Sequence, residues 1–442
     1  MKKILIAFLC ISTLGFAQKV NYQKLDELLE VLSDNEKIMG SMSILKESKV
    51  VYNNSVGYQY INYKGKKEAT EQTKYKIGSI TKTFTSTMIF QLVEEGKITL
   101  DTKLSTYFAQ VPNASNITIA NLLTHSSGLY NLTNADAFAS WKNKPTTPEE
   151  MLSRIVEFDS DFQPGEKNVY SNTNFLLLGY IIENIDNKTY AEALKTRIVD
   201  KLGLKNTYCG GDIDTVAKES HSYNYSDNMW QQSTETHMSL PGGAGAITSN
   251  ASDLTIFMDA LFSNKLISSE SLEIMTTEDN DDFCKGIFKT SVEGQTIFGH
   301  EGGIDGFQSM LVYVPQFKTA IALTANALNY NKMTIMINAF KTSMEMDFEL
   351  PNFNKIVVTA ANVKQYAGIY ESTETPFDLV FESNGNTLKG APEGSNLKDL
   401  IPTKKDEFTF DALGIQLNFN LEAQTVLFKR ADNKPILFTK KL

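Results

Sequence analysis

Histidine and cysteine are scarce in this chain of 442 residues, which contains four histidines and three cysteines. Their spacing matches neither a set of zinc ligands nor a redox pair, so we expect no metal site and no cofactor. One cysteine, Cys10, lies in an apolar N-terminal stretch. For Cys209 and Cys284 the sequence leaves open whether they form a disulfide.

An excess of positive charge is also absent, because 42 Lys and Arg residues stand against 52 Asp and Glu residues, a formal net charge of -10 at pH 7. This balance argues against non-specific binding to nucleic acid or to an anionic membrane surface. After the N-terminus no stretch approaches the ~18 apolar residues that a membrane-spanning helix needs. The composition therefore indicates an ordinary soluble globular protein.

The N-terminus has a different character from the rest of the chain. A basic start, Met1-Lys2-Lys3, precedes an apolar run from Ile4 to Phe16 that ends at the small residue Ala17. This order is typical of a secretory signal peptide. We therefore expect residues 1–17 to be removed and the protein to be secreted or periplasmic. A lipid anchor at Cys10 is disfavoured because that cysteine lies inside the apolar run.

Hydrophobic periodicity divides the remainder into two parts. Residues 21–350 begin with a helix and short strands, continue with a helix-rich middle, and end with three strands and a helix. We expect an α+β fold in which strands from both ends share one antiparallel sheet flanked by helices. The helical middle forms a second lobe, with a site in the cleft between them.

The C-terminal part changes pattern after a linker at residues 351–362. Residues 363–442 alternate apolar and polar positions, which predicts a small all-β domain, either a sandwich or a barrel. An accessory domain that narrows the catalytic cleft is favoured over a barrel that binds an apolar ligand or a sugar, since no cluster of polar groups marks a site there.

A serine and a lysine, Ser79 and Lys82, are three residues apart where a predicted strand gives way to a predicted helix. On a helix such residues lie on one face. A serine hydroxyl needs an adjacent base to become a nucleophile, and a lysine can be that base if burial or another cation lowers its pKa. The pair therefore predicts nucleophilic catalysis.

The same spacing occurs at two other places in the chain. Ser43 and Lys46 lie in a predicted strand, where such residues point to opposite faces. Ser395 and Lys398 follow a turn. Only Ser79 opens a helix, so it is the candidate nucleophile.

Two later motifs supply further groups that this chemistry requires. Tyr170-Ser171-Asn172 lies between a Pro-Gly turn and a helix. A tyrosine beside a lysine ammonium could ionise and move protons, and Asn172 could hold a substrate amide. His300-Glu301-Gly302-Gly303 is expected where a short strand ends. Its glycines would let a substrate backbone approach, and the Gly303 N–H would complete an oxyanion hole with that of Ser79. The plainer alternative for His300 is a turn histidine with one backbone hydrogen bond.

In this order the three motifs resemble those of the penicillin-recognising serine hydrolases, which include class C β-lactamases, D,D-carboxypeptidases, D-aminopeptidases and related esterases. The flanking segments 122–129 and 299–307 agree, and the resemblance covers about residues 21–350. It implies a fold like that of β-lactamases and transpeptidases. It further implies that Ser79 is acylated and that Lys82 and Tyr170 act together as general base and acid. It also implies substrate binding by Asn172, His300, Gly302 and Gly303. His125 and Gly128 suit a structural role at least as well as a direct one.

The histidine shifts the expected substrate, because His300 stands where β-lactamases have the lysine of Lys-Thr-Gly. The resemblance then favours a D-amino-acid peptide, or else a small ester, over a β-lactam. A β-lactamase and a slowly deacylating penicillin- or muropeptide-binding sensor stay open, since they share these motifs. A Ser-His-Asp α/β-hydrolase is disfavoured because the chain has no Gly-x-Ser-x-Gly.

Overall fold

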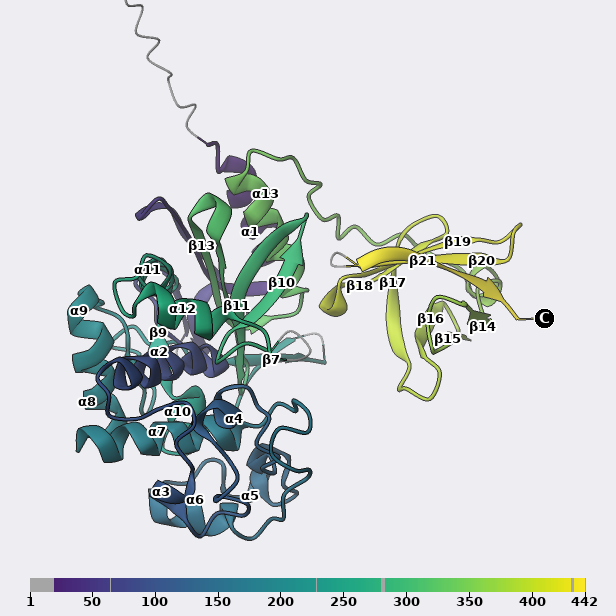
Figure 1. Ribbon diagram of the computed structural model, residues 1–442. Helices are drawn as coiled ribbons and strands as arrows, with labels where there is room; N and C mark the ends of the chain where they lie inside the picture. The colour runs from purple at the N-terminus through teal and green to yellow at the C-terminus, as the bar shows by residue number, and fades with distance from the viewer. Residues whose placement is uncertain (1–19, 64, 228, 280–282, 431–432, 442) are drawn as a thin grey trace, which may run out of the picture.

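The computed structural model describes residues 20–63, 65–227, 229–279, 283–430 and 433–441. The predicted signal peptide, residues 1–17, lies outside these ranges, so export stays a prediction. Figure 1 shows a larger part that ends after helix α13 and a β-barrel joined to it by an extended segment. Among the described residues, no helix combines the length and apolar character that crossing a bilayer requires.

The larger part is built on an antiparallel sheet in the order β10-β11-β12-β13-β1-β2. An N-terminal strand, β1, pairs with the late strand β13 on one side and with β2 on the other. The prediction that strands from both ends of this part share one sheet is therefore confirmed. Strand β10 was not predicted. The strands are β1 (Ile38–Lys46), β2 (Lys49–Val56), β10 (Phe288–Val292), β11 (Gln295–Ile304), β12 (Phe307–Val314) and β13 (Thr319–Leu328).

Helices cover both faces of this sheet (Figure 1). On one face α1 (Gln23–Asp34) and α13 (Lys332–Ser343) form a core with the strands, because apolar residues recur at helical spacing along α1. On the other face α11 (Ala251–Phe262) packs against β1 and β13. The side chain of Asn250 caps α11, because it accepts a hydrogen bond from Asp253 N at 2.9 Å.

The helical lobe surrounds α2 (Thr81–Glu94), which is buried on all sides from Thr81 to Leu92. It packs against α7 (Asn172–Asp186) and the short α10 (Gly242–Gly245). The remaining helical elements are α3 (Ser105–Phe108), α4 (Ile119–Leu123), η2 (Leu132–Asn134), α5 (Phe138–Trp141), α6 (Pro148–Ile155), α8 (Tyr190–Leu194), η3 (Lys195–Val199), α9 (Asp200–Leu202), α12 (Ser269–Thr276) and η4 (Pro315–Phe317).

Short strands complete this part of the chain. They are β3 (Tyr58–Asn62), β4 (Gly65–Glu68), β5 (Tyr75–Lys76), β6 (Tyr208–Cys209), β7 (Tyr223–Ser226), β8 (Met229–Gln232) and β9 (Ile247–Ser249). No disulfide joins Cys209 to Cys284 within the described residues, and the Cys284 thiol donates to the Thr276 carbonyl oxygen instead.

The C-terminal part is a closed barrel of eight strands in which β14 pairs with both β15 and β21. Aromatic side chains fill its interior, among them Phe381, Phe408 and Phe419. A side chain at Gly390 would lie 2.7 Å from the Phe381 ring, so the packing there is tight. The filled interior favours an accessory domain over a ligand-binding barrel. Its elements are α14 (Ala360–Lys364), β14 (Gly368–Glu371), β15 (Leu379–Asn384), β16 (Thr387–Pro392), β17 (Lys398–Lys404), β18 (Glu407–Phe410), η5 (Asp411–Leu413), β19 (Ile415–Asn420), β20 (Thr425–Arg430) and β21 (Asn433–Lys440).

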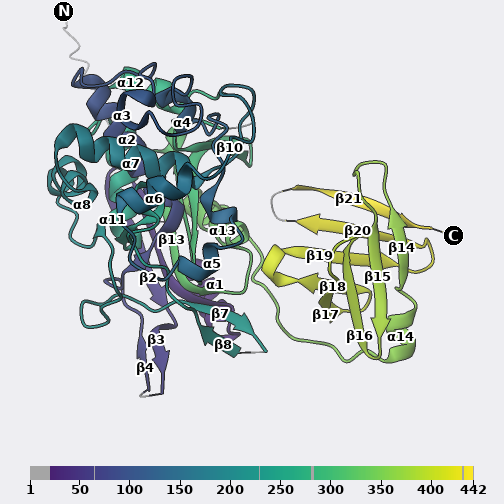
Figure 2. The ribbon, with the colours of Figure 1, turned by 90° about the horizontal axis from the view of Figure 1, so that it is seen from below.

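The barrel touches the larger part through the turn η5 between β18 and β19 (Figure 2). Lys37 Nζ lies 2.8 Å from a carboxylate oxygen of Asp411, and both side chains are only 12% exposed. The backbone N–H of Asn331 donates to the Asp411 carbonyl oxygen at 3.0 Å. Because Asn331 caps α13, the barrel docks at the first turn of that helix.

Candidate active site

Ser79 lies in a one-turn 3₁₀ helix, η1 (Gly78–Ile80), that leads from β5 into α2. Gly78 has φ +51°, and a side chain there would lie 2.8 Å from Gly303 N. Glycine tolerates both the positive φ and the close approach of Gly303 because it has no Cβ. The turn that carries Ser79 therefore lies directly against β11.

Lys82 reaches back over one helical turn to Ser79, as its spacing predicts. Its Nζ is 2.9 Å from Ser79 Oγ, 2.8 Å from Asn172 Oδ1 and 2.8 Å from the Ala244 carbonyl oxygen. The side chain is fully buried, and burial lowers the pKa of its ammonium well below the usual value. Lys82 is thus poised to exchange a proton with Ser79.

Tyr170 approaches Ser79 from the loop before α7. Its hydroxyl donates to Ser79 Oγ at 2.8 Å. Burial raises the pKa of the phenol, and the hydrogen bond with Ser79 opposes that shift only in part. Burial thus favours the protonated form of the hydroxyl, and the ionisation of Tyr170 stays a prediction.

His125 holds the Tyr170 loop in place. Its ring lies 4.4 Å from the Tyr170 ring, centroid to centroid, and its Nδ1 accepts a hydrogen bond from Ser171 N at 3.2 Å. Three residues further on, Gly128 has φ +77°, and a side chain there would lie 2.0 Å from the Phe162 carbonyl oxygen. These contacts support the structural role that the sequence offered for both residues.

Asn172 begins α7 with its side chain between Lys82 and the preceding loop. Its Nδ2 donates to Thr133 Oγ1 at 3.1 Å, and its backbone N–H donates to Asn131 Oδ1 at 3.1 Å. Sequence reasoning missed Thr133 and Asn131, because a short polar turn about 40 residues upstream carries no signal of its own.

His300 lies within β11, which continues to Ile304, so the predicted end of the strand before His300 is wrong. Its ring is 6.3 Å from that of Tyr170, and its Nδ1 is 2.6 Å from the Glu301 carbonyl oxygen. Burial is the main cause that lowers the pKa of His300 to about 3. The imidazole is therefore neutral at physiological pH, and one backbone hydrogen bond, as in the plainer interpretation, fixes its orientation.

The two glycines after His300 have different surroundings. A side chain at Gly302 would lie 2.0 Å from the Ile77 carbonyl oxygen and 2.2 Å from Ser309 Oγ. Gly302 therefore makes room for the segment before Ser79. At Gly303 the nearest atom to such a side chain would be 4.0 Å away, and this residue faces the space around Ser79.

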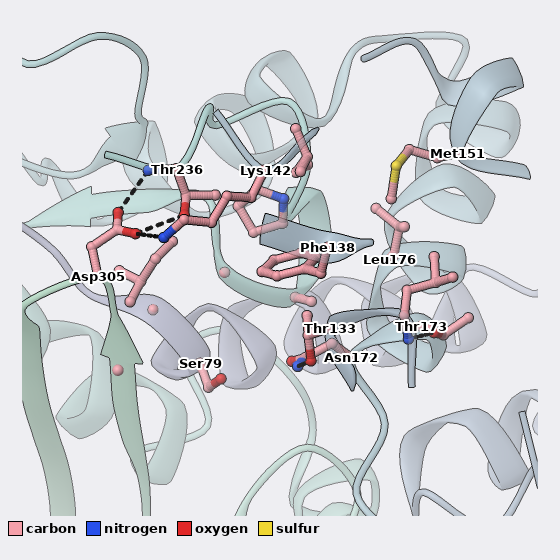
Figure 3. A pocket seen from close by; sticks show the side chains of 18 of the residues that line it. Ser79, Thr133, Phe138, Lys142, Met151, Asn172, Thr173, Leu176, Thr236 and Asp305 are labelled. Atoms are coloured by element: carbon pink, nitrogen blue, oxygen red, sulfur yellow. Dashed lines mark hydrogen bonds and ion pairs between the residues drawn. The ribbon is translucent and has the colours of Figure 1, made fainter. Parts of the chain in front are cut away.

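Ser79 and Gly303 lie between two cavities. The smaller has a volume of about 280 Å³ and is also lined by Asn172 and Thr133. Figure 3 shows Lys142 and Asp305 on one side of it and Met151 and Leu176 on the other. The larger has a volume of about 540 Å³ and is lined by Tyr170 and His300, among others. Within the described ranges, no group of three or more His, Cys, Asp or Glu side chains is arranged to hold a metal ion.

Comparison with known proteins agrees with this geometry. Residues 25–341 match the family model described as Beta-lactamase. The chain belongs to the β-lactamase family. Its Ser79, Lys82 and Tyr170 cluster, together with the amidases and penicillin-binding proteins among its relatives, makes it a serine hydrolase.

Two relatives of known sequence are named penicillin-binding proteins. Penicillin-binding protein 4* of Bacillus subtilis (strain 168) is 26% identical over 332 residues, which cover 69% of this chain and 72% of that protein. The putative penicillin-binding protein PbpX of the same strain is 26% identical over 329 residues, which cover 72% of this chain and 80% of that protein.

Solved structures of this β-lactamase-family fold include a D-stereospecific amidohydrolase from Streptomyces sp., with a TM-score of 0.63 and 26% identity over 72% of this chain and 98% of that one. An octameric penicillin-binding protein homologue from Pyrococcus abyssi covers 95% of this chain and 100% of its own, with a TM-score of 0.66 and 23% identity. The second likeness extends over the barrel, so the whole two-part fold has a structural counterpart.

Proposed function

We propose that the protein hydrolyses peptide or amide bonds of D-amino acids through an acyl-enzyme on Ser79, with small esters as a second substrate class. One observation carries this proposal: Ser79 Oγ is within hydrogen-bond distance of both Lys82 Nζ and Tyr170 Oη, between two cavities. A nucleophile with two proton-transfer partners and space on both sides suits acyl transfer.

The pKa values of Lys82 and Tyr170 shift in opposite directions, which gives the two residues different roles in proton transfer. Lys82, whose pKa is lowered, accepts the Ser79 proton as Oγ attacks the substrate carbonyl carbon. The N–H groups of Ser79 and Gly303 stabilise the oxyanion. When the scissile bond breaks, Tyr170, whose pKa is raised, passes a proton to the leaving group and regains it from Lys82. Water then attacks the acyl-enzyme, and the same groups carry the protons in the reverse direction.

The neutral His300 supports a peptide, amide or ester substrate over a β-lactam. A lysine at this position would place a positive charge in the larger cavity, whereas the imidazole offers hydrogen bonding without charge. The relative of known structure that is 26% identical is named a D-stereospecific amidohydrolase, which supports D-amino-acid substrates. A slowly deacylating sensor is the second candidate, since two relatives that are 26% identical are named penicillin-binding proteins.

The test replaces the nucleophile. We expect Ser79→Ala to lose labelling by a fluorescent fluorophosphonate and to lower turnover by about 10³-fold or more. Turnover is measured on a D-Ala-D-Ala peptide, a D-amino-acid amide, a chromogenic cephalosporin and short nitrophenyl esters. Ser395→Ala is the matched control, because Ser395 has the same spacing to Lys398 but lies in a turn of the barrel.

The outcomes separate the candidates. Continued product release by the wild type indicates a hydrolase, whereas one equivalent of product followed by no more indicates a sensor. Full labelling and activity of Ser79→Ala would refute the proposed mechanism.

A further inference from the structure

We infer that the smaller cavity receives the acyl part of the substrate and that Lys142 selects acyl groups bearing a carboxylate or carbonyl, rather than a free ammonium, next to an apolar side chain. This inference rests on the proposed function of Ser79 and specifies its substrate. It implies a hydrolase of N-acylated D-residues, such as those inside a peptide, rather than of residues with a free amino terminus.

The position of the proton donor distinguishes the two cavities. The leaving group must receive a proton when its bond to the acyl carbon breaks. Tyr170 lines the larger cavity together with His300, whereas the lining of the smaller cavity includes neither. The leaving group therefore belongs in the larger cavity, and the acyl group extends past Asn172 into the smaller one.

The smaller cavity has an apolar wall and a polar wall. Six side chains from the helical lobe form the apolar wall: Leu132, Phe138, Trp141, Met151, Leu176 and Leu240. Lys142, Asp305 and Thr236 form a polar part of the lining, which lies across the cavity from Met151 and Leu176 in Figure 3. Such a cavity suits an acyl group with an apolar side chain and a separate polar end.

Asp305 has a buried side chain, and both of its carboxylate oxygens accept hydrogen bonds from within the protein. It lies in the turn between β11 and β12 with φ +54°, two residues after Gly303. One carboxylate oxygen accepts from Thr236 N at 2.8 Å, and the other accepts from Thr236 Oγ1 at 2.7 Å and from Lys142 Nζ at 3.3 Å. Its side chain is only 1% exposed, so a ligand in the cavity has little access to the negative charge.

Lys142 is the accessible member of this ion pair. Its side chain is 29% exposed and lines the cavity. An ammonium has three hydrogen-bond donors, and the contact with Asp305 at 3.3 Å engages one of them. The cavity therefore presents a cation with donors to spare. That arrangement attracts a carboxylate or carbonyl and disfavours a second ammonium.

The experiment compares three p-nitroanilides that differ only at the α-nitrogen: N-succinyl-D-phenylalanine, N-acetyl-D-phenylalanine and free D-phenylalanine. Each is measured as a substrate and as a competitor of fluorophosphonate labelling at Ser79. We expect the order succinyl, acetyl, free amine in both measurements. Because a charge-assisted hydrogen bond is lost, Lys142→Met should reduce the advantage of succinyl over acetyl by about tenfold.

Two controls keep this test specific. Lys142→Arg retains the cation and should preserve the order. Lys144→Met removes an exposed lysine two residues away and should change nothing. A preference for the free amine, or an unchanged order in Lys142→Met while Ser79 is still labelled, overturns the inference but leaves the proposed function standing. A Ser79 that takes no label refutes both.

Discussion

Burial acts on three basic side chains around Ser79 in the same direction. It lowers the pKa of Lys82, of His125 and of His300, because a buried charge loses its hydration. For Lys82 the consequence is chemical, since a neutral amine can accept the serine proton. For the two histidines it is electrostatic, since their rings can donate and accept hydrogen bonds without adding charge beside the reacting carbonyl.

The state of His300 makes stability depend on pH. Its folded pKa of about 3 lies below an unfolded value of about 6.5, so below pH 6.5 the unfolded chain binds a proton that the folded chain refuses. The free energy of unfolding therefore falls as the pH falls from about 6.5 towards 3. At pH 5 we expect His300 to account for a loss of about 2 kcal/mol relative to neutral pH.

Urea unfolding at pH 7.5 and pH 5 checks this expectation. His300→Gln should lose less stability between the two values than the wild type, since glutamine does not titrate. The control is His237→Gln, because His237 lies outside the catalytic cluster. This variant should lose as much stability between the two pH values as the wild type. An equal loss in wild type and His300→Gln would show that His300 is already protonated at pH 5.

At the scale of elements, β11 and the turn η1 are pressed together through glycine. Gly302→Ala would bring a methyl group to 2.0 Å from the backbone carbonyl oxygen of Ile77, a clash that only a shift of the backbone can relieve. We expect it to move Ser79 and to lower kcat/KM by about 10²-fold or more, as displacement of a reacting group does.

Gly303→Ala is the matched comparison for that variant. Its methyl group would meet no atom closer than 4.0 Å, and its backbone N–H is retained. We expect an unchanged thermal midpoint here and a lowered one in Gly302→Ala, whose methyl group meets backbone atoms. Equal losses in the two variants would contradict the division of roles between these glycines.

The motifs were readable from the sequence because their spacing is local, as with Ser79 and Lys82 on one helical turn. The shared sheet was readable from strand patterns at both ends. The extent of β11 was not, because Gly302 and Gly303 weaken any strand pattern and only pairing with β12 reveals it. The ion pair of Lys142 and Asp305 could not be predicted for another reason. The two residues are 163 positions apart in the sequence, and only the tertiary fold brings them together.

At the scale of the whole molecule, the barrel is coupled to the active site through the first turn of α13. Asp411 bonds to Asn331 and Lys37, and the next residue of the helix, Lys332, lines the larger cavity. The barrel thereby restrains one wall of the space assigned to the leaving group.

A double-mutant cycle measures this coupling. Lys37→Met and Asp411→Asn should each destabilise the protein, and together by about 2 kcal/mol less than their sum, because a pair only 12% exposed is poorly screened by solvent. Asp411→Asn should also change KM among substrates that differ in the leaving group more than among those that differ in the acyl group. Additive stabilities, or equal effects on both substrate series, would contradict the coupling.

The burial of α2 on all sides has a consequence for how the protein unfolds. Amide protons between Thr81 and Leu92 can meet solvent only when the helical lobe comes apart, so this helix belongs to the slowest-exchanging, last-opening unit of the larger part. Ser79 and Lys82 are mounted at its start. The nucleophile and its base therefore survive the fluctuations that open loops and chain ends, and they are lost only in the cooperative event that unfolds the lobe around them.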